Sequence, residues 1–253
     1  EVSFPEERIK YMLELAQPSL FITDAASILA SNFTNILSWK HCNEACKAKP
    51  TKEPIPNIQG QFSYILFTSG STGRPKGVLM NRIASDNLIA WQIKDSTLSA
   101  SSKTLQFSPL TFDVSFQEIF STLAIGGTLY CVEDSIKSDA DKLLHFIAEQ
   151  KIERIFLPFV ALQALCDAAV AASLYPASLR EVMTAGEQLK ITPQLISFFT
   201  QHKEAILFNH YGPTEAHVVS SLKLEGTPHL WPELPSIGKP ISNSRLLILD
   251  AQG

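Results

Sequence analysis

The chain has 253 residues, of which 45% are hydrophobic and 18% are charged, and its formal net charge is −4. That length supports one large or two modest domains with a sizeable core, and the slightly acidic balance gives no electrostatic argument for nucleic-acid binding. No apolar run approaches the roughly 18 to 20 residues of a membrane span and no charged and apolar leader opens the chain, so we expect a cytoplasmic protein without a nucleic-acid or membrane partner.

Short apolar runs alternate with longer amphipathic runs along the chain, which predicts an α/β fold of parallel strands joined by crossover helices. Near the start we expect helices over 5–17 and 25–37, with a strand over 20–23 between them. Residues 47–59 contain Pro50, Pro54 and Pro56, which neither a helix nor an interior strand accommodates. We therefore predict an exposed connector over 47–59.

An apolar strand then runs from Tyr64 into a segment of hydroxyls and glycines that contains Lys76. Glycines let backbone N–H groups converge on an anion, hydroxyls donate further hydrogen bonds, and the lysine adds a mobile positive charge, so the segment indicates a polyphosphate site. The order Pro75-Lys76-Gly77 does not match the P-loop, which needs a lysine directly after the last glycine and a Ser or Thr after it. An ordinary Ser/Gly-rich loop is the alternative.

The remaining elements continue the alternation. The periodicity predicts helices over 82–94, 116–124, 139–150, 160–172 and 193–202, and strands over 127–132, 154–157, 181–184 and 205–208. Two polar positions at the ends of these elements are candidates for chemistry. Asp113 precedes an apolar helix and is either a site residue or an N-cap, and Thr214 and Glu215 follow a Gly-Pro bend, where a plain solvated turn is the alternative.

Several ordered motifs together carry a resemblance to a known family. They are Thr68 to Gly77, Phe107-Ser108-Pro109 with Phe112-Asp113, Thr184-Ala185-Gly186-Glu187, the run from Asn209 to Glu215, and Ile237-Gly238-Lys239-Pro240. In these motifs the chain resembles the adenylate-forming enzymes and, within them, the amino-acid-activating adenylation domains of nonribosomal peptide synthetases. The resemblance implies that 1–253 is part of the large N-terminal domain, with layered sheets and crossover helices. The family's ribose-binding aspartate, hinge, C-terminal lysine and small C-terminal domain would lie beyond Gly253.

The resemblance also implies ATP and Mg²⁺ as cofactors. Lys76 would contact the β- and γ-phosphates, Thr214 would meet the α-phosphate, and Glu215 would ligate Mg²⁺, which makes these three the expected catalytic residues. Asn209 and Tyr211 would contact the nucleotide. The alternatives are that Asn209 is a strand-end residue bonding its own backbone and that Tyr211 is a core aromatic. The implied nucleotide-binding residues are Thr68, Ser69, Gly70, Ser71, Thr72, Gly73, Lys76, Gly186, Glu187, Asn209, His210, Tyr211, Gly212 and Thr214.

For the substrate, the resemblance implies that Asp113 pairs with the α-ammonium of an amino acid. The matched pocket positions are Asp113, Val114, Gln117, Phe156, Met183, Ala185, His210, Val218 and Val219. Most of these residues are apolar, which excludes a substrate with a charged side chain. For His210 and Gln117, the alternative is that each only satisfies a hydrogen bond within the core. The set resembles the pocket of proline-activating domains. One methylene group changes the binding free energy in an apolar pocket by only about 1–3 kcal/mol, so pipecolate and small aliphatic amino acids remain alternative substrates.

The resulting prediction is ATP-dependent activation of L-proline to an aminoacyl-AMP, with release of pyrophosphate and transfer to a carrier-protein thiol. Two alternatives are an acyl- or aryl-CoA synthetase, whose relatives in the family lack the aspartate that matches Asp113, and a nucleotide- and amino-acid-binding fragment with little turnover.

Overall fold

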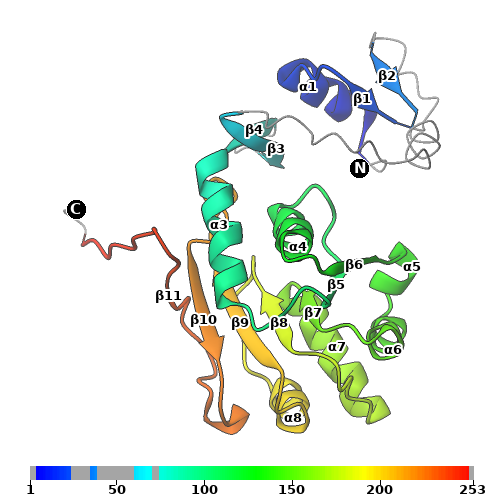
Figure 1. The fold of residues 1–253 in the computed structure, drawn as a ribbon, viewed down its shortest axis with the longest axis vertical. Coiled ribbons are helices and arrows are strands. Elements are labelled where there is room, and N and C mark those ends of the chain that lie inside the picture. The colour runs from blue at the N-terminus through cyan, green and yellow to red at the C-terminus, as the bar shows by residue number, and fades with distance from the viewer. Residues whose placement is uncertain (1–3, 24–34, 39–59, 70–73, 251–253) are drawn as a thin grey trace. The chain divides into compact units, whose positions relative to one another are not determined.

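The structure is a computed structural model in which residues 4–23, 35–38, 60–69 and 74–250 are described. Internal contacts divide the chain into two compact units, Glu1–Leu79 and Met80–Gly253 (Figure 1). The predicted connector over 47–59 and the loop residues Gly70, Ser71, Thr72 and Gly73 lie outside the described residues.

The first unit begins with helix α1 (Glu6–Ala16), which confirms the helix predicted over 5–17. Strand β1 (Phe21–Ile22) pairs in parallel with β2 (Ile36–Leu37). The helix predicted over 25–37 is therefore wrong at its C-terminal end, since the backbone there joins a sheet, and its residues 25–34 lie outside the described part. The apolar pattern was compatible with either element because short apolar runs do not separate strand from helix.

A second pair of strands flanks the glycine-rich segment. Strand β3 (Phe62–Ser69) confirms the predicted apolar strand, and it pairs with β4 (Pro75–Asn81), whose last two residues belong to the second unit. Lys76 therefore stands at the start of β4, where it is exposed. A Cβ at Gly77 would lie 2.8 Å from Ile65 Cδ1, so a larger residue there would displace the end of the Ile65 side chain.

The second unit is built on a seven-stranded sheet of order β11-β10-β9-β8-β7-β5-β6. The five neighbouring strands β9, β8, β7, β5 and β6 run parallel, whereas β10 pairs antiparallel with both β9 and β11. In register, Thr104 pairs with Arg154 and Ile155 with Val182. The strands are β5 (Lys103–Gln106), β6 (Thr128–Cys131), β7 (Arg154–Phe156), β8 (Glu181–Thr184), β9 (Ile206–Tyr211), β10 (Ser220–Leu224) and β11 (Lys239–Pro240).

Six α-helices and one 3₁₀ turn connect the strands described in this unit. They are α3 (Arg82–Asp95), α4 (Asp113–Ala124), α5 (Asp134–Lys137), α6 (Ala140–Gln150), α7 (Phe159–Ala172), α8 (Pro193–Gln201) and η2 (Pro228–Leu230). Short polar side chains begin three of them by accepting a backbone N–H: Asn81 for α3, Asp139 for α6 and Thr192 for α8. These residues satisfy donors that have no partner inside the helix.

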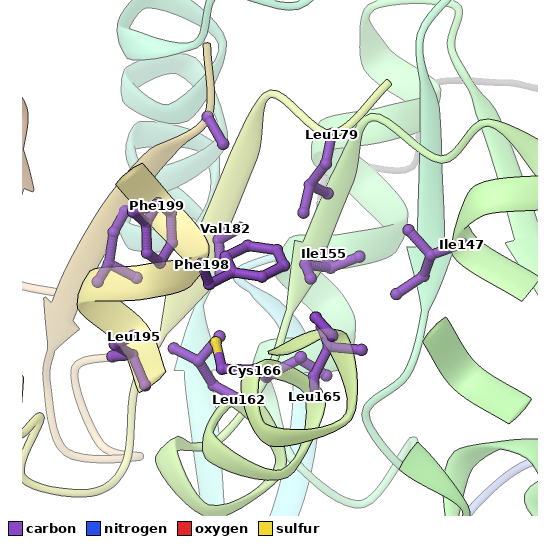
Figure 2. Packing of buried hydrophobic residues seen from close by; sticks show 14 of the residues in the cluster. Ile147, Ile155, Leu162, Leu165, Cys166, Leu179, Val182, Leu195, Phe198 and Phe199 are labelled. Carbon is purple, nitrogen blue, oxygen red and sulfur yellow. The ribbon is translucent and has the colours of Figure 1, made fainter. Parts of the chain in front are cut away.

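One face of the sheet packs against α6, α7 and α8 through a continuous apolar core. Figure 2 shows the Phe198 ring of α8 extending toward Val182 of β8 and Ile155 of β7, beside Leu162 of α7. These side chains are fully buried. Because every second strand residue points to this side, the same strands present a different set of residues to the opposite face.

The opposite face carries a smaller apolar cluster of Phe156, Met183 and Phe208, against which Val114 of α4 packs. A third cluster joins Leu88 of α3 to Val218. No helix among the described residues is long and apolar enough to cross a membrane.

Most predicted elements of the second unit are confirmed within one or two residues, and β8 coincides with the predicted strand over 181–184. Helix α4 begins at Asp113 rather than at 116, and β9 continues to Tyr211 rather than ending at 208. Strands β5, β10 and β11 were not predicted, because their polar residues interrupt the apolar runs on which the assignment rested.

Candidate functional site

A cavity of about 540 Å³ lies where the parallel strands end. The segments directly after β5, β7, β8 and β9 line it together with the first turns of α4, so it occupies the carboxyl edge of the sheet, where open α/β sheets commonly bind ligands. The lining is Phe107, Ser108, Pro109, Phe112, Asp113, Val114, Gln117, Phe156, Leu157, Pro158, Met183, Thr184, Ala185, Gly186, Glu187, His210, Gly212, Pro213, Thr214, His217 and Val218.

Eight of the nine predicted substrate positions line this cavity. They are Asp113, Val114, Gln117, Phe156, Met183, Ala185, His210 and Val218. Val219 does not line it, so its assignment to the pocket is wrong; it lies just before β10, where its backbone N–H donates to the Tyr211 carbonyl and its carbonyl accepts from Ile241. The predicted set, drawn from five separate segments of the chain, is thus brought together at one place.

Asp113 is the first residue of α4 and faces the cavity. The position before it, Phe112, is the N-cap and makes no side-chain capping bond, so the alternative that Asp113 itself caps the helix is wrong. No described residue donates a hydrogen bond to the Asp113 carboxylate. The carboxylate at a helix N-terminus is stabilised by the helix dipole and remains available to a cation.

Gln117 stands one turn further along α4 and is almost fully buried. Its side-chain amide donates a 2.5 Å hydrogen bond to Oε1 of Gln92, a buried residue of α3. The predicted core hydrogen bond is therefore present, and it orients an amide that also lines the cavity. Gln92 was not identified from the sequence because its partner lies 25 residues away.

His210 is buried at the cavity wall, next to Trp91 of α3, with ring centroids 5.5 Å apart in an edge-to-face arrangement. Burial lowers the pKa of His210 to about 3, and nearby His217 acts in the same direction. Nε2 of His210 has no hydrogen-bond partner among the described residues. A neutral ring with a free polar atom at the wall is suited to a ligand hydrogen bond.

His217 also lines the cavity, and the sequence analysis did not identify it. Its ring is buried and its Nε2 lies 2.9 Å from the backbone oxygen of Asp113. Gly212, one of the predicted nucleotide-binding residues, permits this arrangement, because a Cβ there would lie 1.5 Å from the His217 carbonyl oxygen. A lone histidine gives no sequence signal of such a contact across 104 residues.

The Gly186–Glu187 segment follows β8 at the cavity wall. Gly186 has φ +82°, which favours glycine over any residue with a Cβ. The Glu187 carboxylate accepts a 3.1 Å hydrogen bond from the backbone N–H of Val160 in the first turn of α7. The helix start therefore fixes one carboxylate oxygen of Glu187.

Thr214 lines the cavity within a turn closed by a 3.0 Å bond from Ala216 N–H to the Pro213 carbonyl. Glu215 is exposed on that turn and outside the lining. No group of three acidic, His or Cys residues within the described residues could hold a metal ion by itself. The exposed carboxylate nevertheless fits Mg²⁺, which is commonly bound by one or two carboxylates together with substrate phosphates.

Two further predicted nucleotide residues, Asn209 and Tyr211, do not line the cavity. The Asn209 amide donates to the Ser236 carbonyl at 2.9 Å, so it bonds a distant loop and not its own backbone. The Tyr211 side chain is 47% exposed, so the core-aromatic alternative is wrong. Thr68 and Ser69 on β3 and Lys76 on β4 belong to the first unit.

A buried polar network supports the loop that follows β5. The Glu118 carboxylate of α4 accepts the backbone N–H groups of Phe107 and Ser108 at 3.2 and 3.1 Å. Burial raises the pKa of Glu118 to about 7, although these donors act in the opposite direction. Glu118 thus holds two residues of the cavity wall in place.

The network continues around Arg154 of β7, which is almost completely buried. Its guanidinium donates to the hydroxyls of Thr104 and Thr122 at 3.1 and 2.9 Å and lies 3.9 Å from Oε2 of Glu181. Glu181 in turn accepts a 2.6 Å bond from the Thr97 backbone after α3. The charged groups therefore connect α4 and the segment after α3 to the sheet.

A family model described as "AMP-binding enzyme" matches residues 1–253. The chain belongs to the AMP-binding enzyme family. The relationship to adenylate-forming enzymes predicted from the motifs is thereby confirmed.

Curated proteins similar to this AMP-binding family member are much longer than it. Tyrocidine synthase 2 of Brevibacillus parabrevis is 36% identical over 97% of the chain, and gramicidin S synthase 2 of Brevibacillus brevis is 32% identical over 98%. The chain spans 7% of the length of the first and 6% of the length of the second.

Solved structures support the predicted fold of this AMP-binding family member. The nonribosomal peptide synthetase FmoA3 matches 99% of the chain with a TM-score of 0.82 at 23% identity, and the match covers 26% of that structure's chain. Holo-PA1221, described as containing adenylation and PCP domains, matches 100% of the chain and 42% of its own with a TM-score of 0.79 at 23% identity. The α/β fold with crossover helices is confirmed.

Proposed function

We propose that the protein uses ATP to activate the carboxylate of an amino acid, forming an aminoacyl-AMP and releasing pyrophosphate. The observation that carries the proposal is the Asp113 carboxylate on the wall of a largely apolar cavity at the carboxyl edge of the sheet, in a member of the AMP-binding enzyme family. A carboxylate without a hydrogen bond from the described residues is suited to pair with an α-ammonium group.

The apolar wall supports a small, uncharged side chain, and we propose L-proline as the substrate. Phe156 and Met183 are buried under the cavity and Val114 packs against them, so a charged side chain would lose its hydration there without a partner. His210 and Gln117 add polar atoms to the same wall. Small apolar analogues should differ from proline by little binding free energy, so the exchange assay has to compare their rates with that of proline.

In the proposed reaction, a substrate carboxylate oxygen forms a bond to the α-phosphorus while the bond to the bridging oxygen of pyrophosphate breaks. Thr214, on the cavity wall, would orient the α-phosphate, and Lys76 would offset charge on the departing phosphates. Mg²⁺, when bound with ATP, neutralises phosphate charge, and Glu215 is the residue that would hold it.

The proposal extends to a carrier-protein thiol as the acceptor of the aminoacyl group, in the cytoplasm as expected from the sequence. Its support is that the solved structure of holo-PA1221 contains a PCP domain beside an adenylation domain, and that the similar curated proteins are named as synthases of tyrocidine and gramicidin S.

ATP–pyrophosphate exchange in the full-length protein tests the proposed function. L-proline should support exchange, with pipecolate and small aliphatic amino acids weaker and benzoate or a fatty acid inactive. Asp113→Asn should lower kcat/KM for the amino acid roughly 150- to 5,000-fold, because losing one partner of a buried ion pair costs about 3–5 kcal/mol. Asp134→Asn is the matched control, since Asp134 is also the first residue of a helix but lies outside the cavity lining.

Exchange with benzoate or a fatty acid and none with amino acids would instead support the acyl- or aryl-CoA synthetase alternative. Tight nucleotide binding without exchange would support a binding protein with little turnover. An unchanged preference in Asp113→Asn would contradict the role of Asp113 even if the wild-type protein activates proline.

Lys76→Ala should lower kcat for exchange more than it raises the KM for the amino acid. The reason is that a phosphate contact that strengthens as pyrophosphate departs acts on the transition state and not on amino-acid binding. Single-turnover adenylate formation combined with amino-acid titration measures the two effects separately. Equal changes in both would contradict the assignment of Lys76.

A further inference from the structure

His217 joins two elements of the site that are far apart in the sequence. Its Nδ1 accepts the backbone N–H of Val218 at 2.9 Å, and its Nε2 lies 2.9 Å from the Asp113 carbonyl oxygen. An atom that accepts an N–H carries a lone pair, so the ring proton of the neutral form is on Nε2 and is donated to Asp113. The two contacts therefore define one tautomer.

The backbone on either side leaves His217 little freedom to move. The residue has φ +56°, in the left-handed region that most side chains avoid, and its carbonyl approaches Gly212 too closely for any Cβ there. A 2.8 Å bond from Val219 N–H to the Tyr211 carbonyl closes the same turn. The ring is thus attached to a rigid turn between β9 and β10.

The groups around the ring favour its neutral form. Burial lowers the pKa of His217 and outweighs the negative charge of Asp113 and the hydrogen bond to its backbone, which both raise it, while neighbouring His210 is itself neutral. The Phe116 ring of α4 packs edge-on at 6.5 Å between centroids. A neutral ring can serve as donor and acceptor at once, as the two bonds require.

We propose that His217 is a positioning residue that fixes the first turn of α4 against the β9–β10 turn and so holds the Asp113 carboxylate at the cavity wall. The inference rests on the proposed function, in which Asp113 receives the amine of the substrate. Asp113 is bound through its backbone and leaves its carboxylate for the ligand. The contact also connects the amine site to Thr214, which stands on the same turn.

Two substitutions separate the bond to Asp113 from the rest of the residue. In His217→Asn, Oδ1 stands where Nδ1 stood and asparagine tolerates positive φ, but the side chain is too short to reach Asp113. In His217→Gln, Nε2 is as many bonds from Cα as the histidine Nε2 and can donate to Asp113 again. His202→Gln is the matched control, because His202 is another buried histidine with a ring nitrogen on a backbone carbonyl, that of Pro176, outside the cavity.

The readout is ATP–pyrophosphate exchange in the full-length protein, with the amino acid and ATP varied separately. His217→Asn should raise the amino-acid KM roughly tenfold, in line with one lost hydrogen bond, and leave the ATP KM within about twofold. His217→Gln should restore most of the affinity, and His202→Gln should leave both KM values unchanged even if it lowers the melting temperature.

Equal amino-acid KM values in the Asn and Gln variants, or equal changes in both KM values in the Asn variant, would overturn the role of His217 while leaving the proposed function intact. Absence of amino-acid-dependent exchange in the wild-type protein would overturn both. Should the Asn variant not fold, ¹⁵N chemical shifts of the wild-type ring decide: a proton on Nε2 supports the assignment, and a proton on Nδ1 overturns it.

Discussion

On β7 and β8, Ile155 and Val182 face α6, α7 and α8, whereas the residues just before them, Arg154 and Glu181, face the side that carries α3 and α4. The first side is filled with aliphatic and aromatic carbon, and the second buries an arginine and carboxylates. Because adjacent strand residues point in opposite directions, the same strands build a packed core on one side and a polar site on the other.

Substitutions on the two sides should therefore affect different properties of the protein. On the apolar side, lost atoms leave a cavity, so the expected effect is on the free energy of unfolding. On the polar side, hydrogen bonds of Glu118 and His217 reach the cavity wall, so the expected effect includes amino-acid binding.

Phe198→Ala should have the largest effect on the apolar side, lowering the free energy of unfolding by about 3–5 kcal/mol. The ring is fully buried between α8 and the sheet (Figure 2). Urea unfolding of the 253-residue chain, followed by tryptophan fluorescence, measures the loss, and Leu230→Ala is the control because Leu230 is 82% exposed. A changed amino-acid KM in folded full-length Phe198→Ala protein would contradict the view that the apolar side affects stability alone.

Glu118→Gln should change how stability on the polar side depends on pH. Burial raises the Glu118 pKa from 4.5 to about 7, so the folded chain keeps a proton that the unfolded chain loses between these values. Stability contributed by this group is therefore greatest below pH 4.5 and declines by roughly 3 kcal/mol as the pH rises to about 7, at about 1.4 kcal/mol per pKa unit.

Glutamine cannot ionise, so the variant should gain stability relative to wild type as the pH rises through this window. Urea unfolding of both chains at several pH values between about 4.5 and 8 measures the difference. A difference that stays constant across the window would contradict the raised pKa. The wall residues Phe107 and Ser108 keep an acceptor in Glu118→Gln, so the amino-acid KM should change by less than about threefold.

The sequence predicts the apolar side better than the polar one. Periodicity identified α6, α7 and α8, since the residues that repeat along each helix are those that fill the core. Periodicity did not predict β5 and β10, which contain the polar residues Thr104 and Lys223. Whether a strand can include a polar residue depends on its neighbours in space, which the local sequence does not show.

The cavity lining was predicted from ordered motifs, not from periodicity. Asp113 and the apolar positions matched a family pattern, whereas His217, Gln92 and Glu118 carry no local signature and act through contacts with other elements. Their roles follow from geometry, which brings together groups 10 to 104 residues apart. Sequence reasoning thus found most of the residues that line the cavity and missed most of those that hold them in place.

Thr192→Ala should have the smallest effect, lowering the free energy of unfolding by about 1 kcal/mol. The Thr192 hydroxyl accepts the Leu195 N–H at 3.2 Å as the N-cap of α8 and donates to Gln163 of α7 at 2.7 Å. Thr192→Ser keeps both bonds and should stay close to wild type in urea unfolding, so an equal loss in both variants would contradict the cap. Because α8 covers the apolar side, neither variant should alter the amino-acid KM, and a change there would mean that the two sides are coupled through the strands.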